Sequence, residues 1–248
     1  MPRQPREKSK TGIYHVLTRG INRQDIFVDS EDKRIYLDRL STYKEKCAFQ
    51  IYAYCLMSNH LHLLIKEGDV PISEIMKKLN ISYVYWYNRK YNRVGHLFQD
   101  RFMSEPVEDD RYLLTLIRYI HQNPVKVGQS ISEWTSYDDY VSNSGLTESS
   151  FVLKIFNDDI SKAVEQFRQY VNKNEDQKYM DVELSKRITD EEAKTLILRI
   201  GNISYCQQLQ DFNRIERDTI LRRLKDNGLS IRQIERLSGI NRGIILNA

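Results

Sequence analysis

The segments FQIYAYCLM (49–57) and HLHLLIK (60–66) constrain the fold of this chain more than any other feature of its sequence. Both are short runs of aliphatic, aromatic and β-branched residues, which are typical of buried strands. Only Ser58 and Asn59 separate them, and these residue types favour tight turns. The sequence therefore predicts a β-hairpin, and with it an antiparallel sheet, in the N-terminal half of the chain.

Strands and amphipathic helices alternate around this hairpin. Further strands are predicted over 12–20 and 96–107, and helices over 30–47, 72–92 and 109–122. The resulting order, β-α-β-β-α-β-α, is that of a ferredoxin-like antiparallel sheet with helices on one face, extended by a final helix. The predicted fold class of this part is therefore α+β.

Only helical patterns occur toward the C-terminus. Helices are predicted over 214–228 and 230–239, with Gly228 ending the first and Ser230 capping the second. A short turn joins these two helices, and a further helix begins at Asn241. The C-terminal part is therefore expected to be a small all-α domain of the helix-turn-helix type.

Charge divides the 248 residues into three parts. Basic residues exceed acidic ones by three over 1–145 and by four over 186–248, whereas acidic residues exceed basic ones by three over 146–185. We expect an N-terminal α+β domain, an acidic and partly helical connector, and the C-terminal helical domain at these boundaries. Weakly basic domains suit polyanion binding, although small net charges are common on solvated surfaces.

Composition argues against a membrane protein and against a secreted disulfide framework. Hydrophobic residues make up 40% and charged residues 29%, and no apolar run approaches the roughly 18 residues of a membrane span. The basic N-terminus is not followed by the apolar segment of a secretory signal. Cys47, Cys55 and Cys206 have unrelated spacings. We therefore expect a cytoplasmic protein with no membrane partner.

His60 and His62 stand two residues apart in the second strand of the hairpin, although the chain has only five histidines. Alternate residues of a strand point to the same face, so both imidazoles project together. Two imidazoles on one face can bind one divalent metal; the alternative is a pair of partly buried structural histidines. A three-ligand zinc site would also need His15, His96 or His121, because the strand carries no Asp or Glu.

The third predicted helix carries a candidate nucleophile. Tyr119 and Asn123 are four residues apart, which places them on one face near the end of the helix. A tyrosine hydroxyl beside a metal-bound phosphate can act as a nucleophile, and a carboxamide oxygen can bind a metal. Tyr112, two turns earlier on about the same face, is a rival nucleophile that lacks such a partner. Most of the 16 tyrosines are expected to be packing residues, among them Tyr83 and Tyr87.

Four segments resemble blocks of a known family. SNHLHLLI (58–65) looks like the His-hydrophobic-His motif of HUH endonucleases, and RYIHQNPVKVG (118–128) looks like the tyrosine-bearing helix of single-tyrosine transposases. YHVLTRGINRQDIF (14–27) and GHLFQDRFMS (95–104) resemble two further blocks of the branch called REP-associated tyrosine transposases. The blocks occur in the same order and cover about residues 12–130.

The resemblance implies that residues 1–145 are an HUH single-tyrosine transposase domain. Its metal, Mg²⁺ or Mn²⁺, would be held by His60, His62 and Asn123. Tyr119 would be the nucleophile. The family often has Gln at the third ligand position, and the shorter Asn123 departs from that pattern. The implied reaction nicks and rejoins single-stranded hairpin or palindromic DNA through a 5′-phosphotyrosine intermediate, without a nucleotide cofactor.

Binding DNA requires cations along the phosphate backbone. Arg19 and Arg23 follow the first strand and Arg101 lies in the fourth predicted strand, within the blocks that carry the resemblance. Arg3, Arg6, Lys8 and Lys10 form a basic arm. The C-terminal candidates line the turn and the start of the next helix, where such motifs contact DNA. They are Arg232, Arg236, Asn241 and Arg242.

Three matters stay open from the sequence. The chain could be a nucleoid-associated transposase, or a domesticated DNA-binding protein that keeps the fold without turnover. The presence of His60, His62 and Tyr119 together favours the enzyme, because a binding protein has no need of all three. The C-terminal domain could instead serve dimerisation or docking on the catalytic domain, and the protein could act as a monomer or a homodimer.

Overall fold

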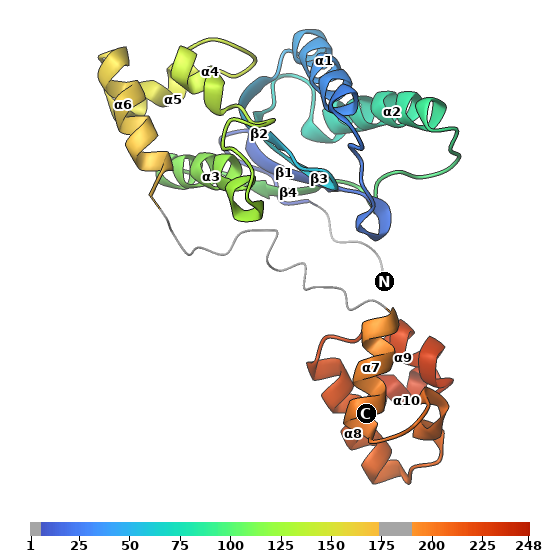
Figure 1. Cartoon of the computed structure of the whole chain (residues 1–248). Coiled ribbons are helices and arrows are strands. Elements are labelled where there is room, and N and C mark those ends of the chain that lie inside the picture. The colour runs from blue at the N-terminus through green and yellow to red at the C-terminus, as the bar shows by residue number, and fades with distance from the viewer. Residues whose placement is uncertain (1–5, 174–189) are drawn as a thin grey trace. The chain divides into compact units, whose positions relative to one another are not determined.

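A four-stranded antiparallel sheet with the strand order β2-β3-β1-β4 lies at the centre of the N-terminal unit (Figure 1). The computed structural model describes residues 6–173 and 190–248. This strand order belongs to a ferredoxin-like sheet and confirms the predicted α+β fold class. The strands are β1 (Ile13–Arg19), β2 (Gln50–Leu56), β3 (His60–Lys66) and β4 (Met103–Pro106).

Helices cover both faces of this sheet (Figure 1). α1 (Ser30–Cys47) and α2 (Ile72–Lys90) lie on one face, where Leu61 and Leu63 of β3 join the main core. α3 (Asp110–Gln122), the final helix of the predicted order, takes the opposite face and contacts β2 and β3. β1 and β3 are therefore buried along most of their length, and several of the polar residues that they carry are buried as well. Short 3₁₀ turns follow β1 and α3, namely η1 (Ile21–Arg23) and η2 (Val125–Val127).

The fourth strand is shorter than predicted. The sequence indicated one strand over 96–107, whereas β4 covers only the last part of that segment. Asp100 Oδ1 accepts a hydrogen bond from the backbone N–H of Arg101 at 2.6 Å. That amide is then engaged locally and not in the sheet ladder. Earlier in the segment, one isolated bridge joins Phe98 to Gly20.

The first unit continues past the predicted boundary at residue 145. α5 (Ser149–Phe156) and α6 (Ile160–Val171) fall within the predicted connector, yet α6 packs against α3. Phe167 of α6 stacks on Tyr140 of α4 (Tyr137–Ser142), with ring centroids 4.4 Å apart. The predicted boundary was too early because it rested on net charge, and exposed helix faces are as charged as linkers.

The C-terminal unit is all-α and has its own core, to which Ile197, Leu221, Ile234 and Ile245 belong. Residues 174–189, which include the end of the predicted connector, lie outside the described residues. Both predicted helices of the helix-turn-helix type are present. None of the described helices is long and apolar enough to cross a membrane. The elements are α7 (Asp190–Gly201), η3 (Cys206–Gln210), α8 (Arg214–Asp226), α9 (Ile231–Ser238) and α10 (Arg242–Asn247).

Candidate active site

The sheet face under α3 gathers polar residues from β1 and β3. In the register of these strands, Leu17 lies opposite His62 and Arg19 lies opposite His60. Directly opposed residues of antiparallel strands project to the same side. Arg19 and both histidines therefore share one face, and the two imidazoles project together as their alternate spacing predicts.

His60 and His62 are oriented by hydrogen bonds in which their Nδ1 atoms take part. Their ring centroids are 5.2 Å apart and the rings are nearly perpendicular, at 87°. Nδ1 of the half-buried His60 lies 2.6 Å from Oδ1 of Asn59, and Nδ1 of the fully buried His62 lies 2.9 Å from Nε2 of His15. With both Nδ1 atoms engaged in this way, Nε2 is the nitrogen that each ring can offer to a metal.

This donor set fits a metal that keeps open coordination positions. Within residues 6–173 and 190–248, no group of three or more His, Cys, Asp or Glu side chains could hold an ion. A metal at the pair would have two imidazole ligands and would take the remaining ligands from an amide, a phosphate or water. In phosphate chemistry, proteins commonly supply only some of the ligands of Mg²⁺ or Mn²⁺, although imidazole is softer than the ligands Mg²⁺ prefers.

Tyr119 of α3 lies over the histidines. Its side chain is buried, and its ring meets that of His62 edge-on with centroids 5.6 Å apart. The centroid of the His15 ring is 6.2 Å from that of Tyr119. Lys126, in the turn after α3, places its Nζ 4.0 Å from the centroid of the tyrosine ring. The structure thus brings together the histidine pair and the tyrosine that the sequence separates by some sixty residues.

Asn123 occupies the C-cap position of α3. Its buried side chain donates a hydrogen bond from Nδ2 to the backbone carbonyl of Tyr119 at 3.2 Å. The carboxamide therefore caps the helix that carries the tyrosine. Its service as a third metal ligand, which would use Oδ1, stays a prediction.

The rival tyrosine, Tyr112, points to a different group. Its hydroxyl donates to Oε1 of Glu105 at 2.5 Å. Glu105 lies directly opposite His15 in the β1–β4 register, with Oε2 3.9 Å from Nδ1 of His15. Interaction with His15 lowers the pKa of the Glu105 carboxyl. Sequence reasoning did not combine these residues, although the alternation of His15, Leu17 and Arg19 along β1 was a signal for a shared face.

The other histidines lie elsewhere. His121 is fully buried, its Nε2 lies 2.8 Å from Oγ of Ser136, and burial lowers its pKa to about 3. It is a structural histidine of the region where α3, α4 and α6 meet. His96 lines a pocket beside α2. Of the three candidates for completing a zinc site, only His15 is near the pair, and its Nε2 faces a ring nitrogen of His62.

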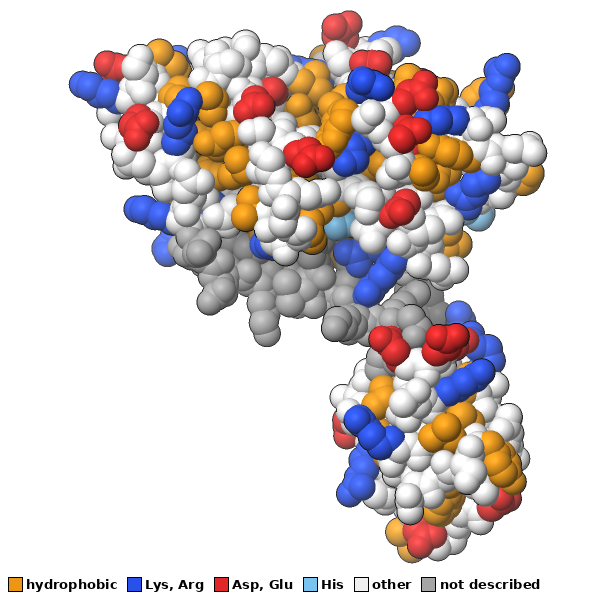
Figure 2. Space-filling model, in the orientation of Figure 1, with side chains coloured by type: hydrophobic (Ala, Val, Ile, Leu, Met, Phe, Trp, Pro, Cys, Tyr) orange, Lys and Arg blue, Asp and Glu red, His pale blue; other side chains and the backbone are white. Residues whose placement is uncertain are grey.

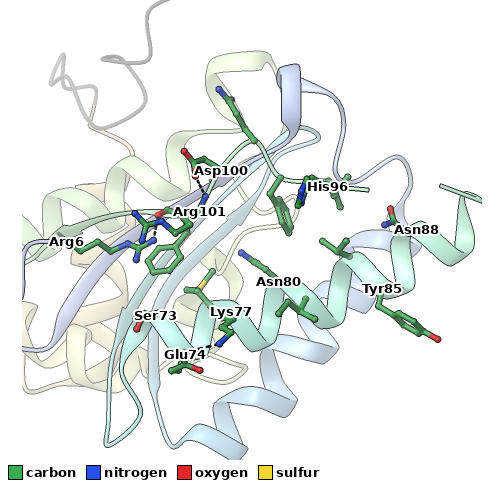
Figure 3. A pocket seen from close by; sticks show the side chains of 17 residues that line it. Arg6, Ser73, Glu74, Lys77, Asn80, Tyr85, Asn88, His96, Asp100 and Arg101 are labelled. Atoms are coloured by element: carbon green, nitrogen blue, oxygen red, sulfur yellow. Dashed lines mark hydrogen bonds and ion pairs between the residues drawn. The ribbon is translucent and has the colours of Figure 1, made fainter. Parts of the chain in front are cut away.

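That pocket has a volume of about 870 Å³ and lies between α2 and residues 96–102 (Figure 3). Arg6 and Arg101 lie side by side at one end, and Tyr85 projects from α2 at the rim. The Arg6 guanidinium sits 3.8 Å from the centroid of the Phe102 ring. Tyr85 is 72% exposed, which is unusual for so large a ring. The pocket thus has two basic side chains at one end and an exposed aromatic ring at the other.

The three predicted arginines of the first unit lie at different places. Arg19 is half-buried on the histidine face, and Arg23 ends η1, with a positive φ of 60°. Arg101 is exposed at the pocket and precedes β4 instead of lying in a strand. The backbone N–H of Gln99 donates to the carbonyl of Arg19 at 2.9 Å, so the wall of the pocket begins beside the end of β1.

In the second unit, the four predicted DNA-contacting residues are all exposed. Arg232 lies on the outer side of α9, and Arg242 begins α10. Arg236 is ion-paired with Asp190 of α7, and Oδ1 of Asn241 accepts from the backbone N–H of Gly243 at 2.8 Å. Two of the four side chains thus have structural partners, and contact with DNA stays a prediction for all of them. Figure 2 shows basic side chains interspersed with acidic ones on the visible face of each unit.

A ferredoxin-like sheet with two histidines on a central strand, facing a tyrosine on the covering helix, defines a single-tyrosine HUH-type domain. Comparison with known proteins gives the same class: residues 8–123 match the family described as IS200-like transposases. Residues 8–123 of this chain are therefore similar to that family.

Similar proteins carry related names. A curated Haemophilus influenzae protein named as a REP-associated tyrosine transposase is 27% identical over an alignment of 113 positions, which covers 38% of this chain and 62% of that protein. A solved REP-associated tyrosine transposase, bound to a REP hairpin, is 19% identical, covers 60% of this chain and 90% of its own, and has a TM-score of 0.49. A crystal structure described as a transposase from Deinococcus radiodurans is 15% identical, covers 52% of this chain and 99% of its own, and has a TM-score of 0.35.

Proposed function

We propose that the first unit cleaves and rejoins single-stranded DNA at hairpin or palindromic sequences, with Tyr119 as the nucleophile. The observation that carries this proposal is the edge-on contact of Tyr119 with His62, at 5.6 Å between ring centroids. A phenol held at that distance from a metal-binding imidazole can reach a phosphate bound at the same place. The name of the curated relative, which refers to REP elements, supports DNA of this kind as the substrate.

The residues of the chain would divide the work as follows. Nε2 of His60 and of His62 would hold Mg²⁺ or Mn²⁺, which when bound supplies charge to polarise the scissile phosphate. The Tyr119 hydroxyl attacks phosphorus, forming a Tyr–O–P bond while the bond to the 3′ oxygen breaks. The phenol proton is lost to water, and the departing 3′ oxygen gains a proton. The products are a 5′-phosphotyrosine on the protein and a free 3′-OH.

The same step in reverse accounts for rejoining. A 3′-OH of another strand attacks the phosphotyrosine, restores a phosphodiester and frees Tyr119. Since one phosphoester bond replaces another, no nucleotide cofactor is needed. Lys126 Nζ, 4.0 Å from the ring centroid, would supply positive charge beside the reacting phosphate.

A bound DNA strand would contact the side chains that border the site. Arg19 shares the histidine face and would contact phosphate. The pocket that begins beside it offers Arg6 and Arg101 for the backbone and the exposed Tyr85 ring for an unstacked base. This combination of cations and an aromatic face suits single strands better than a duplex, whose bases are already stacked.

Trapping the covalent intermediate tests the proposal. A hairpin oligonucleotide labelled at its 3′ end is incubated with the full chain and Mn²⁺, and denaturing gels reveal any protein that carries label. Wild type is expected to form the adduct, Tyr119→Phe to form none, and Tyr112→Phe to form it at a reduced rate. An adduct in Tyr119→Phe would contradict the assignment. Stable binding without an adduct in wild type would favour the alternative of a DNA-binding protein without turnover.

A further inference from the structure

A row of polar side chains leads away from Nδ1 of His62, the ring nitrogen that the proposed metal site does not use. It passes from His62 on β3 to His15 on β1, then to Glu105 on β4 and Tyr112 on α3. His62 Nδ1 and His15 Nε2 are 2.9 Å apart, and His15 Nδ1 is 3.9 Å from Glu105 Oε2. The Tyr112 hydroxyl donates to the other oxygen of Glu105 at 2.5 Å. Four elements thus contribute to one line of contacts.

The chemistry of these groups determines which atom donates and which accepts at each contact of the row. An ionised carboxylate only accepts hydrogen bonds. Its negative charge favours the His15 tautomer whose proton is on Nδ1, the nitrogen nearest to Glu105. In that tautomer, Nε2 of a neutral His15 is an acceptor, so the hydrogen bond to His62 needs its proton on Nδ1 of His62. The Nε2 atom of His62 is then left as a lone-pair donor.

The partner of His60 selects the same tautomer by another route. The carbonyl oxygen Oδ1 of Asn59 lies 2.6 Å from Nδ1 of His60 and can only accept, so His60 carries its proton on Nδ1. Both imidazoles therefore present Nε2. Two histidines that only fill space in a core would have no reason to share one tautomer.

We propose that Glu105 and His15 are positioning residues, which hold His62 in the tautomer and orientation that present Nε2 to the catalytic metal. Tyr112 in turn orients Glu105, so the rival nucleophile has a supporting place in the same site. Carboxylate partners of metal-binding histidines commonly act in this way, and here a second histidine stands between the carboxylate and the ligand. The inference rests on the proposed function, because it assigns a purpose to the metal-binding role of His62.

The test compares Mn²⁺ binding by full-length Glu105→Gln and Glu108→Gln, followed by electron paramagnetic resonance without DNA. Each variant removes one negative charge from the same stretch of chain, but Glu108 is exposed and accepts from the backbone of Lys10 instead of facing His15. Loss of an outer partner of a metal ligand typically weakens binding roughly 10- to 100-fold. We expect a weakening in that range for Glu105→Gln and none for Glu108→Gln.

A pair of substitutions at His15 separates positioning from packing. His15→Phe keeps a ring of similar size but removes both hydrogen-bonding atoms, and we expect it to weaken Mn²⁺ binding at least as much as Glu105→Gln. His15→Gln retains a donor and an acceptor and should restore part of the affinity. Nitrogen-15 NMR of the metal-free proteins reads the tautomer directly. It should find His62 protonated on Nδ1 in wild type and a mixture of tautomers in His15→Phe.

The outcomes distinguish the two proposals. Wild-type Mn²⁺ affinity or an unchanged His62 tautomer in both Glu105→Gln and His15→Phe would overturn the positioning roles and leave the proposed function standing. If His62→Ala binds Mn²⁺ as wild type does, the metal site itself is elsewhere and both proposals fail.

Discussion

The ammonium group of Lys126 lies 4.0 Å from the centre of the Tyr119 ring, held there by η2, the turn that follows α3. A cation in this position is worth about 0.5–2 kcal/mol, or roughly a 2- to 30-fold change in rate if it acts in the transition state. We expect Lys126→Gln to slow adduct formation within that range and Lys126→Arg to retain most of the rate. Time courses of adduct formation measure these rates, and Lys154→Gln, at an exposed position of α5, is the control. Equal rates for Lys126→Gln and wild type would exclude a role for the charge.

The exposed ring of Tyr85 should contribute to single-strand affinity. Stacking of one base on an aromatic side chain is worth about 1–3 kcal/mol, which corresponds to roughly 5- to 150-fold in affinity. We expect Tyr85→Ala to weaken binding of a fluorescent single strand by this amount and Tyr85→Phe to leave it nearly unchanged. Fluorescence anisotropy at fixed salt provides the measurement. Wild-type affinity in Tyr85→Ala would remove the pocket rim from the path of the DNA.

Phe167 should be essential to the first unit although it lies beyond the predicted domain boundary. It is fully buried and stacks on Tyr140, and truncating such a residue to Ala typically costs about 3–5 kcal/mol. Phe151, at 49% exposure, is the matched control, and Phe151→Ala should cost clearly less. Urea unfolding monitored by tryptophan fluorescence checks both. Equal, small effects would mean that α6 is not part of this core.

His121 should make stability depend on pH. Its pKa is about 3 in the folded protein, because burial disfavours the charged form, and about 6.5 when unfolded. Between these values the unfolded chain binds the extra proton, so the free energy of unfolding falls as the pH falls from about 6.5 toward 3. Each pH unit in this window removes up to about 1.4 kcal/mol.

His121→Asn should flatten that dependence. Asn lacks the titrating ring and can keep a hydrogen bond to Ser136, the present partner of His121. Urea unfolding at pH 7 and pH 5 should therefore show a smaller loss of stability in the variant than in wild type. The same loss in both proteins would assign the pH dependence to other groups.

Local patterns were enough to predict the hairpin and the shared face of its two histidines, while the family resemblance predicted that Tyr119 joins them. Strand alternation placed His60 beside His62, and helical spacing placed Tyr119 near the end of its helix. The part that failed depended on contacts between distant segments. Glu105, the partner of Tyr112, faces His15 through the β1–β4 register, which no spacing in the sequence encodes.

The lengths of the fourth strand and of the N-terminal domain were mispredicted for equally specific reasons. The predicted fourth strand is interrupted where the Asp100 carboxylate takes the backbone N–H of Arg101, a local competition that residue type alone does not resolve. The N-terminal domain was ended too early because its acidic stretch was taken for a linker. Only the packing of Phe167 shows that α6 returns to the domain.

β1 carries residues with opposite purposes at alternate positions. Tyr14 and Val16 belong to the core, while His15 and Arg19 project to the side of the histidine pair. A slip of one residue against β3 would exchange these sets, burying an arginine under α1 and α2 and turning the core residues toward α3. Such a slip would be severely destabilising, so the stability of the sheet itself selects the register in which Arg19 and the two histidines share one face.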